Sequence, residues 1–223
     1  MYVPAHNAMP LDEATAILEQ VRLADLVTVD PATLAPASTP LPMIHRPSAD
    51  GFGSLEAHLA RPNRQWEHTE HPALVILRGG DAYVNPTWYP TYRDGANAVP
   101  TWNYEVVQVT GRLVAHDDVE WLDGHVRRLS ERFDPEFDLD RNEARVNAGM
   151  LRAIVGVELI IDGVVGKSKL SQNRSTADIV GVAEALDADA RGDLADRMRE
   201  VSLPHAQARE AAVHNAQQRR SHH

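Results

Sequence analysis

The sequence contains no cysteine among its 223 residues. This absence excludes disulfides, thiolate nucleophiles, zinc–thiolate sites, iron–sulfur clusters and cysteine-ligated haem. Basic residues are also scarce, because 22 Lys and Arg stand against 32 Asp and Glu and give a net charge of −10. This balance argues against a nucleic-acid partner, whose phosphates need a broad basic face, but it allows a small basic pocket for a phosphate or carboxylate.

Long apolar runs and nucleotide-binding glycine motifs are missing as well. No run approaches the ~20 apolar residues of a membrane helix. The first residues, Met-Tyr-Val-Pro-Ala-His, lack the basic and apolar regions of a signal peptide. We therefore expect a soluble, cytoplasmic protein without a membrane partner. Neither a G-x-G-x-x-G after a strand nor a P-loop motif is present, which disfavours the folds built on them.

The apolar pattern predicts an α+β fold, an antiparallel barrel with peripheral helices. Strands are expected at 26–29, 37–44, 53–60, 73–77, 82–84, 101–115 and 154–161. Helices are expected at 11–24, at 119–133 behind an Asp117-Asp118 cap, at 141–153 and from Thr176 onward. Gly79-Gly80 is expected to separate two strands, and Gly163 and Gly166 to allow a turn or bulge.

Two domains are predicted from this order of elements. Residues 1–175 would form the cofactor-binding barrel, and residues 176–223 a helical extension packed on it or swapped across a dimer. The apolar stripe of the extension weakens beyond residue 203.

Aromatic residues are only 5% of the chain, yet they gather in two short stretches. Trp88 and Tyr89 form one stretch, and Trp102 and Tyr104 flank Asn103 in the other. Rings that cover a flat ligand and an amide that fixes its edge are a plausible pairing for a cofactor site. Ordinary aromatic packing is the alternative.

His58 lies in a strand whose alternation places it on the same face as Glu56. An imidazole there can ligate haem iron or act as an acid–base group near neutral pH. The alternative is a half-buried histidine that is bonded to a carboxylate or carbonyl.

A polar segment near residue 170 predicts an anion-binding set. Alternation places Lys167, Lys169 and Ser171 on one face, and Gln172 and Arg174 follow. Two ammonium groups and a hydroxyl can hold a phosphate or a propionate. A solvated, charged edge strand is the alternative.

These motifs, in this order, resemble the PaiB-type family of FMN-binding negative transcriptional regulators over nearly the whole chain. The matching segments are Met1–His6, Leu26–Thr28, Pro40–Pro42, His58–Asn63 with Gln65-Trp66, Ala82–Pro90, Val99–Tyr104, Ile154–Gly156 and Gly166–Arg174. The resemblance implies a split β-barrel of the flavin-reductase type, an antiparallel Greek-key barrel, which is usually a homodimer with its cofactor at the subunit interface.

The departures from the family point to a divergent branch. Asp81 and Gln108 stand where family members usually carry histidine, whereas His58 is kept. In this the chain is similar to the haem-dependent piperazate synthases, which form an intramolecular N–N bond in N5-hydroxy-L-ornithine. That resemblance implies an enzyme with haem b and an N-hydroxylated amino acid as its small-molecule substrate.

The same resemblance implies roles for individual residues. His58 would be the axial ligand of the haem iron. The cofactor-binding residues would be His58, Arg61, Trp102, Asn103, Lys167, Lys169, Ser171, Gln172 and Arg174. Arg61 and Arg174 are the candidate partners of the propionates, and Asp81 or Glu105 would meet an ammonium group of the substrate. The alternatives are an FMN-binding PaiB-type regulator and a flavin or haem oxidoreductase on the same barrel.

Overall fold

The computed structural model describes residues 1–69 and 71–221. The chain divides into two units. The barrel unit comprises residues 10–78 and 107–166, and the helical unit comprises residues 1–9, 79–106 and 167 onward. The units therefore do not divide at residue 175, because the helices after that residue share a unit with the ends of three long strands that precede them.

The sheet has seven strands in the order β2-β1-β5-β6-β7-β4-β3. They are β1 (Leu23–Val29), β2 (Pro36–Pro42), β3 (Ile44–Arg46), β4 (Ser54–Ala60), β5 (Pro72–Val84), β6 (Thr101–His116) and β7 (Ile154–Lys169). Strands β2 and β3 end the order on opposite sides, yet only Met43 separates them in the chain. The sheet must therefore curl round on itself, which agrees with the predicted barrel.

The strand pairs that form the barrel wall are antiparallel. Strand β1 pairs with β2 from Leu23↔Pro42 to Val29↔Pro36. Strand β4 pairs with β7 from Ser54↔Ile160 to Ala60↔Ile154. Alternate side chains of these strands fill the interior with large apolar residues. Those exposed by 2% or less include Leu26, Leu55, Leu59 and Leu159.

Two predicted breaks in the strands are wrong. Strand β5 runs unbroken through Gly79-Gly80, and β7 runs unbroken through Gly163 and Gly166. At Gly79 a Cβ would lie 2.9 Å from the Cβ of Glu105, so this glycine serves a close approach of the strands rather than a turn.

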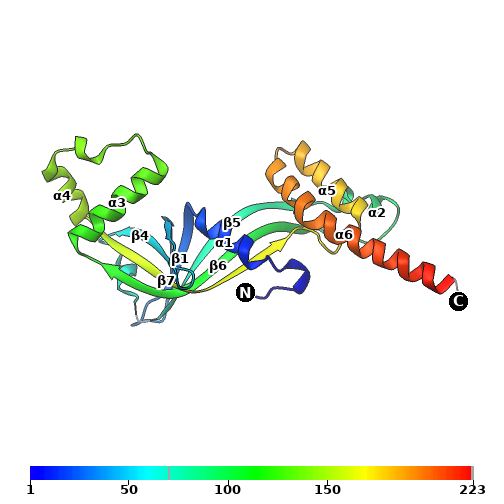
Figure 1. Ribbon diagram of the computed structural model, residues 1–223, viewed down its shortest axis with the longest axis horizontal. Coiled ribbons are helices and arrows are strands. Elements are labelled where there is room, and N and C mark those ends of the chain that lie inside the picture. Colours follow the sequence, from blue (N-terminus) through cyan, green and yellow to red (C-terminus); the bar gives the residue numbers. More distant parts are fainter. Residues whose placement is uncertain (70, 222–223) are drawn as a thin grey trace. The chain divides into compact units, whose positions relative to one another are not determined.

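The barrel unit carries α1 (Leu11–Glu19), α3 (Val119–Phe133) and α4 (Ala144–Arg152), with the short 3₁₀ turns η2 (Arg64–Glu67) and η4 (Leu139–Arg141). Figure 1 shows α3 and α4 in green. The predicted cap of α3 is confirmed at Asp118, whose carboxylate accepts a hydrogen bond from the backbone N–H of Trp121 at 2.7 Å.

The helical unit contains η1 (Ala5–Asn7), η3 (Pro86–Trp88), α2 (Pro90–Arg93), α5 (Thr176–Ala188) and α6 (Gly192–Ser221). Helices α5 and α6 pack side by side (Figure 1). Their shared core includes Tyr89, Ile179, Leu186 and Met198, none of which is exposed. Ala206 is the last residue in this core, so the part of α6 that follows it is solvated through residue 219. No described helix is both long and apolar enough to cross a membrane.

Candidate functional site

His58 lines a cavity in the barrel unit. The cavity has a volume of about 240 Å³. Its walls come from β4, α3, η4, α4 and β7, and its lining residues are His58, Val126, Leu139, Asn147, Met150, Leu151 and Ile154. Five of these seven side chains are aliphatic or thioether groups, so the imidazole and one amide are the only polar side chains that face an otherwise apolar space.

The imidazole of His58 is paired with that of His125 from α3. The His58 Nδ1 and the His125 Nε2 are 3.1 Å apart, and the rings meet edge to face at 74°. His125 is fully buried. Among the described residues, no hydrogen bond engages the Nε2 of His58, so this nitrogen is the one available to a ligand.

A buried carboxylate lies behind the histidine pair. The Glu56 Oε2 is 3.6 Å from the His125 Nδ1, which has no closer hydrogen-bond partner in the described chain. Arg128 donates to the same oxygen from Nη2 at 2.9 Å, and Arg46 is 3.6 Å from Oε1. Burial raises the pKa of Glu56, but the contacts with His125 and Arg128 outweigh burial and leave this pKa below its usual value.

His58 is neutral at physiological pH. Burial, and then the neighbouring His125, lower the pKa of His58 from 6.5 to about 4. A neutral imidazole carries a lone pair on one ring nitrogen, and this is the form that ligates metals. Of the residues that the structure describes, no group of three or more His, Asp or Glu is arranged to hold a metal ion.

The ring of Trp121 holds His125 in place from the other side. It stacks on His125 at 5.2 Å between centroids and on His116 at 4.1 Å. A Cβ on Gly156 would lie 2.1 Å from the Trp121 Cζ3, so the indole occupies the space that a side chain would take on β7. His116 in turn bonds Glu158 at 2.9 Å.

Arg61 has structural partners in the barrel unit. Its guanidinium donates to both carboxylate oxygens of Asp117, at 3.0 and 2.5 Å, and to the backbone oxygens of Arg152 and Ile154. A propionate at this position would compete with Asp117 for the guanidinium.

A basic and aromatic cluster occupies the helical unit. Lys167 and Lys169, the two lysines of the whole sequence, both lie over the ring of Tyr104, with Nζ at 5.3 and 5.8 Å from its centroid. The Lys169 Nζ also donates to the Thr101 Oγ1 and the Trp102 carbonyl, each at 2.5 Å. Burial lowers the pKa of Lys169, and the charge of Lys167 lowers it further. The predicted shared face of the two lysines is therefore confirmed.

The polar residues beside this cluster are tied into a buried network. Ser171 has a positive φ of 68° and donates to the Oδ1 of the fully buried Asn103 at 3.0 Å. The Gln172 amide accepts from the Leu170 N–H and donates to the Ser168 carbonyl. These hydrogen bonds fix the conformation of the chain after β7. They also occupy side-chain polar atoms of Asn103, Ser171 and Gln172 that could otherwise contact a ligand.

Trp102 and Arg174 are differently placed in the same unit. Trp102 is 50% exposed and meets Tyr83 edge to face at 6.2 Å. The guanidinium of Arg174 lies over the ring of Tyr89, 4.3 Å from its centroid. Trp102 thus presents a free aromatic surface, whereas Arg174 covers a core ring.

The two predicted catalytic carboxylates differ in their surroundings. Glu105 is buried and accepts from the Ser168 Oγ at 2.8 Å and from two nitrogens of Arg197 at 2.9 and 3.1 Å. Burial raises the pKa of Glu105. Asp81 is exposed, and its backbone oxygen accepts from Arg191. Of the two, Asp81 has the carboxylate that is open to solvent.

Comparison with known proteins places the chain in a family. Residues 1–163 match a family model described as "Putative FMN-binding domain". The chain belongs to this FMN-binding family. It is also 27% identical over 192 residues to the Protease synthase and sporulation protein PAI 2 of Bacillus subtilis, a match that spans 83% of this chain and 89% of that protein. The PaiB-type resemblance is thereby confirmed.

Solved structures share the fold at low sequence identity. The flavocytochrome Anf3 from Azotobacter vinelandii is 16% identical, with a TM-score of 0.54 over 71% of this chain and 67% of that one. The FAD and heme binding protein from Mycobacterium smegmatis is 18% identical, with a TM-score of 0.50 over 74% of this chain and 73% of that one. The predicted α+β split barrel is confirmed. The comparisons favour the alternative prediction, an FMN-binding PaiB-type protein, over a piperazate synthase.

The residues predicted for one cofactor site fall in both units of the chain. His58 and Arg61 belong to the barrel unit. The helical unit holds Trp102, Asn103, Lys167, Lys169, Ser171, Gln172 and Arg174, as well as Asp81 and Glu105. A single site built from both sets stays a prediction.

Sequence reasoning missed His125 as a site residue. The signal was present, because His125 lies on the same face of the predicted helix as Leu122, Val126 and Leu129. A histidine in an apolar stripe needs a polar partner in the core, and that partner is His58.

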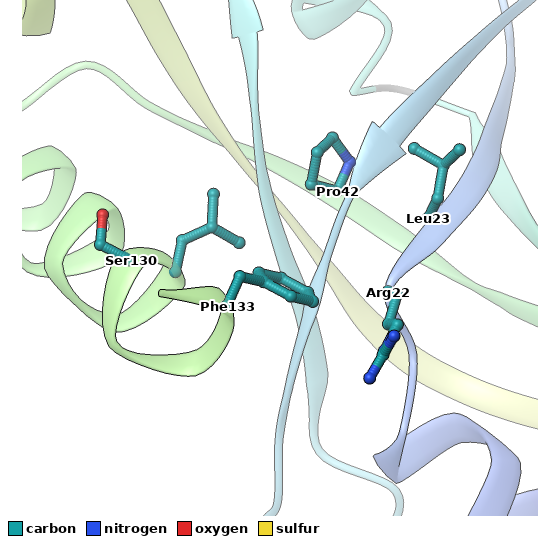
Figure 2. A pocket seen from close by; sticks show the side chains of 6 residues that line it. Arg22, Leu23, Pro42, Ser130 and Phe133 are labelled. Atoms are coloured by element: carbon teal, nitrogen blue, oxygen red, sulfur yellow. The ribbon is translucent and has the colours of Figure 1, made fainter. Parts of the chain in front are cut away.

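A second hollow in the barrel unit carries little chemistry. It has a volume of about 530 Å³ and is lined by Arg22, Leu23, Pro42, Leu129, Ser130 and Phe133. Figure 2 shows the Phe133 ring extending from α3 toward the strands that carry Leu23 and Pro42. Its polar lining is one guanidinium and one hydroxyl, so it offers no acid–base pair.

Proposed function

We propose that this FMN-binding family member is a haem protein whose iron is ligated by His58. The observation that carries the proposal is the neutral imidazole whose Nε2 has no hydrogen bond in the described structure and which lines an apolar cavity. Haem iron is commonly held by a histidine of this kind. A flavin needs no such ligand.

The residues around His58 fit the iron side of a haem. Metal-ligating histidines usually donate their second N–H to a fixed acceptor, and the His58 Nδ1 faces the His125 Nε2 at 3.1 Å. The apolar walls suit a macrocycle. The volume of about 240 Å³ is below the roughly 300–1,000 Å³ of common ligand pockets, so a haem would extend past these residues. The shared fold with a flavocytochrome and with a FAD and heme binding protein supports a haem on this scaffold.

For the reaction, we propose ring closure of N5-hydroxy-L-ornithine to piperazic acid. An N–N bond forms between the α-amine and N5, the N–O bond breaks, and the hydroxyl leaves with one amine proton as water. Bound ferric haem would supply a Lewis acid for this chemistry. The departures at Asp81 and Gln108 support this branch of the family.

The protein's own residues would position the substrate. Asp81 is the better candidate for an ammonium group, because Glu105 is already bonded by Arg197 and Ser168. Holding the two nitrogens close together is the largest contribution that positioning can make to ring closure.

An FMN-binding protein is the second candidate, and the family match favours it. The observation that supports it is the pair of lysines over Tyr104, since ammonium groups bind a phosphate and exposed Trp102 can cover a ring. A regulatory role through DNA contact has less support, because the net charge is −10.

The absorption spectrum separates the two candidates. Purified protein is titrated with hemin and, in parallel, with FMN. A Soret band that shifts on binding in wild type and fails to form in His58→Ala is the expected result. A flavin spectrum with no Soret shift, unchanged in His58→Ala, would overturn the haem proposal in favour of FMN.

The reaction is tested separately. Hemin-loaded protein is incubated with N5-hydroxy-L-ornithine, and the products are analysed by mass spectrometry. The expected product has lost one water and gives the fragment pattern of piperazic acid. Haem-loaded protein that leaves the substrate intact would refute the cyclase and leave haem binding in place.

A further inference from the structure

We propose that His125 and Glu56 are positioning residues that hold the proton of His58 on Nδ1 and so direct the lone pair of Nε2 into the cavity. The inference deepens the proposed function and rests on the proposed role of His58 as the iron ligand. It is carried by the row Glu56–His125–His58, whose successive separations are 3.6 and 3.1 Å.

With one proton on each ring, the two histidines can arrange the proton along their contact in two ways. In the first arrangement, the His58 Nδ1–H donates to the His125 Nε2, and His125 carries its own proton on Nδ1. In the second, the His125 Nε2–H donates to the His58 Nδ1, and His58 carries its proton on Nε2. Only the first arrangement leaves a lone pair on the nitrogen that lines the cavity.

Glu56 selects the first arrangement. The His125 Nδ1 is buried and faces the Glu56 Oε2 at 3.6 Å. In the first arrangement this nitrogen presents N–H to the carboxylate, which is attractive. In the second it presents a lone pair to a negative oxygen, and the His58 Nε2–H has no hydrogen-bond acceptor among the described residues.

The rings are held for this role by packing on α3. Trp121 stacks on His125 at an angle of 16°, and the indole lies where Gly156 leaves space on β7. His125 therefore cannot rotate away from His58 without displacing Trp121. The acceptor of the His58 proton is fixed in position before any cofactor binds, which is the geometry that orients a metal ligand.

The test is nitrogen-15 NMR of the histidine rings in full-length protein that has been prepared without cofactor. Wild type is expected to show His58 with Nδ1 protonated and Nε2 unprotonated. In His125→Leu this preference should be lost, while His125→Gln, whose Oε1 can accept the same proton, should keep it. Glu56→Gln should give a mixture of tautomers without opening a cavity. His205→Gln, at an exposed site in the helical unit, is the control.

Hemin affinity gives a second readout. His125→Leu and Glu56→Gln should weaken hemin binding about 10–100-fold, and His125→Gln should restore most of it. Wild type with His58 protonated on Nε2, or a preference unchanged in both His125→Leu and Glu56→Gln, would overturn the positioning role. If hemin fails to bind while the tautomer responds as expected, the positioning role stands and the haem proposal fails. If hemin binds through His58 and neither variant alters the tautomer, the haem proposal stands and the positioning role fails.

Discussion

The barrel unit and the helical unit both gather polar groups that could serve a cofactor, but they use them differently. In the barrel unit, the Nδ1 of His58 is bonded, its Nε2 has no hydrogen bond among the described residues, and the side chain lines an apolar cavity. In the helical unit, Asn103, Ser171 and Gln172 are hydrogen-bonded to their own neighbours. Polar residue types alone therefore do not identify a binding group, because internal hydrogen bonds decide which of them are still available.

The largest expected effect is loss of hemin binding on removing His58. His58→Ala takes away the single imidazole that lines the cavity. Since this residue is only half-buried at one wall, the fold should persist, and circular dichroism checks that it does. Titration with hemin should give no shifted Soret band in the variant. An intact Soret shift in His58→Ala would show that His58 does not ligate the iron.

The pH dependence of stability should follow His58 in the cofactor-free protein. Its pKa is lowered from 6.5 to about 4 in the folded state, so between these values the unfolded chain binds a proton that the folded chain does not. The free energy of unfolding must therefore fall as the pH drops through this window. The loss between pH 7 and 5 is about 2 kcal/mol.

Urea unfolding at pH 7 and pH 5 measures this loss. His58→Gln should show a smaller loss than wild type, because it removes the group whose pKa differs between the two states. Equal losses in the two proteins would mean that His58 is as easily protonated in the fold as outside it.

The ring stack predicts a large effect from one added methyl group. Gly156→Ala would place a Cβ 2.1 Å from the Trp121 Cζ3 and force the indole off His125. We expect a destabilisation of about 1–3 kcal/mol, as for other overpacked cores, measured by urea unfolding. Gly149→Ala in α4 is the matched control, because its nearest neighbour would be 4.0 Å away. It should stabilise the helix by about 0.5–1 kcal/mol.

The smallest expected effect lies in the helical unit. Lys167→Gln should weaken hemin or FMN binding only by about 5-fold, since Lys169 still lies over the same ring. Arg93→Gln removes an exposed charge in the same unit and should change nothing.

The lysines can also be observed directly. The sequence has two, so reductive methylation with labelled formaldehyde gives two lysine signals in an NMR spectrum. Both should shift when either ligand binds. If neither lysine signal shifts with either ligand, the lysine cluster has a structural role only and does not bind the cofactor.

The sequence predicted the barrel well, because strand alternation and buried apolar positions are local properties. It placed Glu56 and His58 on one face of β4, and both contact His125 in the structure. It also placed Lys167 and Lys169 on one face of β7, where both lie over Tyr104.

The remaining features depend on contacts that no local pattern carries. The glycines at 79 and 163 suggested breaks, yet the neighbouring strand decides whether a glycine serves a turn or a close approach. His58 and His125 are 67 residues apart, so helical periodicity could place His125 in the apolar stripe but could not name the ring that it meets. The hydrogen bonds that Arg61, Ser171 and Gln172 make within the protein could not be predicted either, because no local sequence pattern specifies their partners.

Ligation of the haem iron by His58 is tested by resonance Raman spectroscopy of the hemin-loaded protein after reduction to the ferrous state. An iron–histidine stretching band is expected in wild type. In His58→Ala, haem supplied together with free imidazole should show this band only while imidazole is present. A ferrous wild-type protein without the band, or a His58→Ala variant that shows it unaided, would contradict ligation by His58.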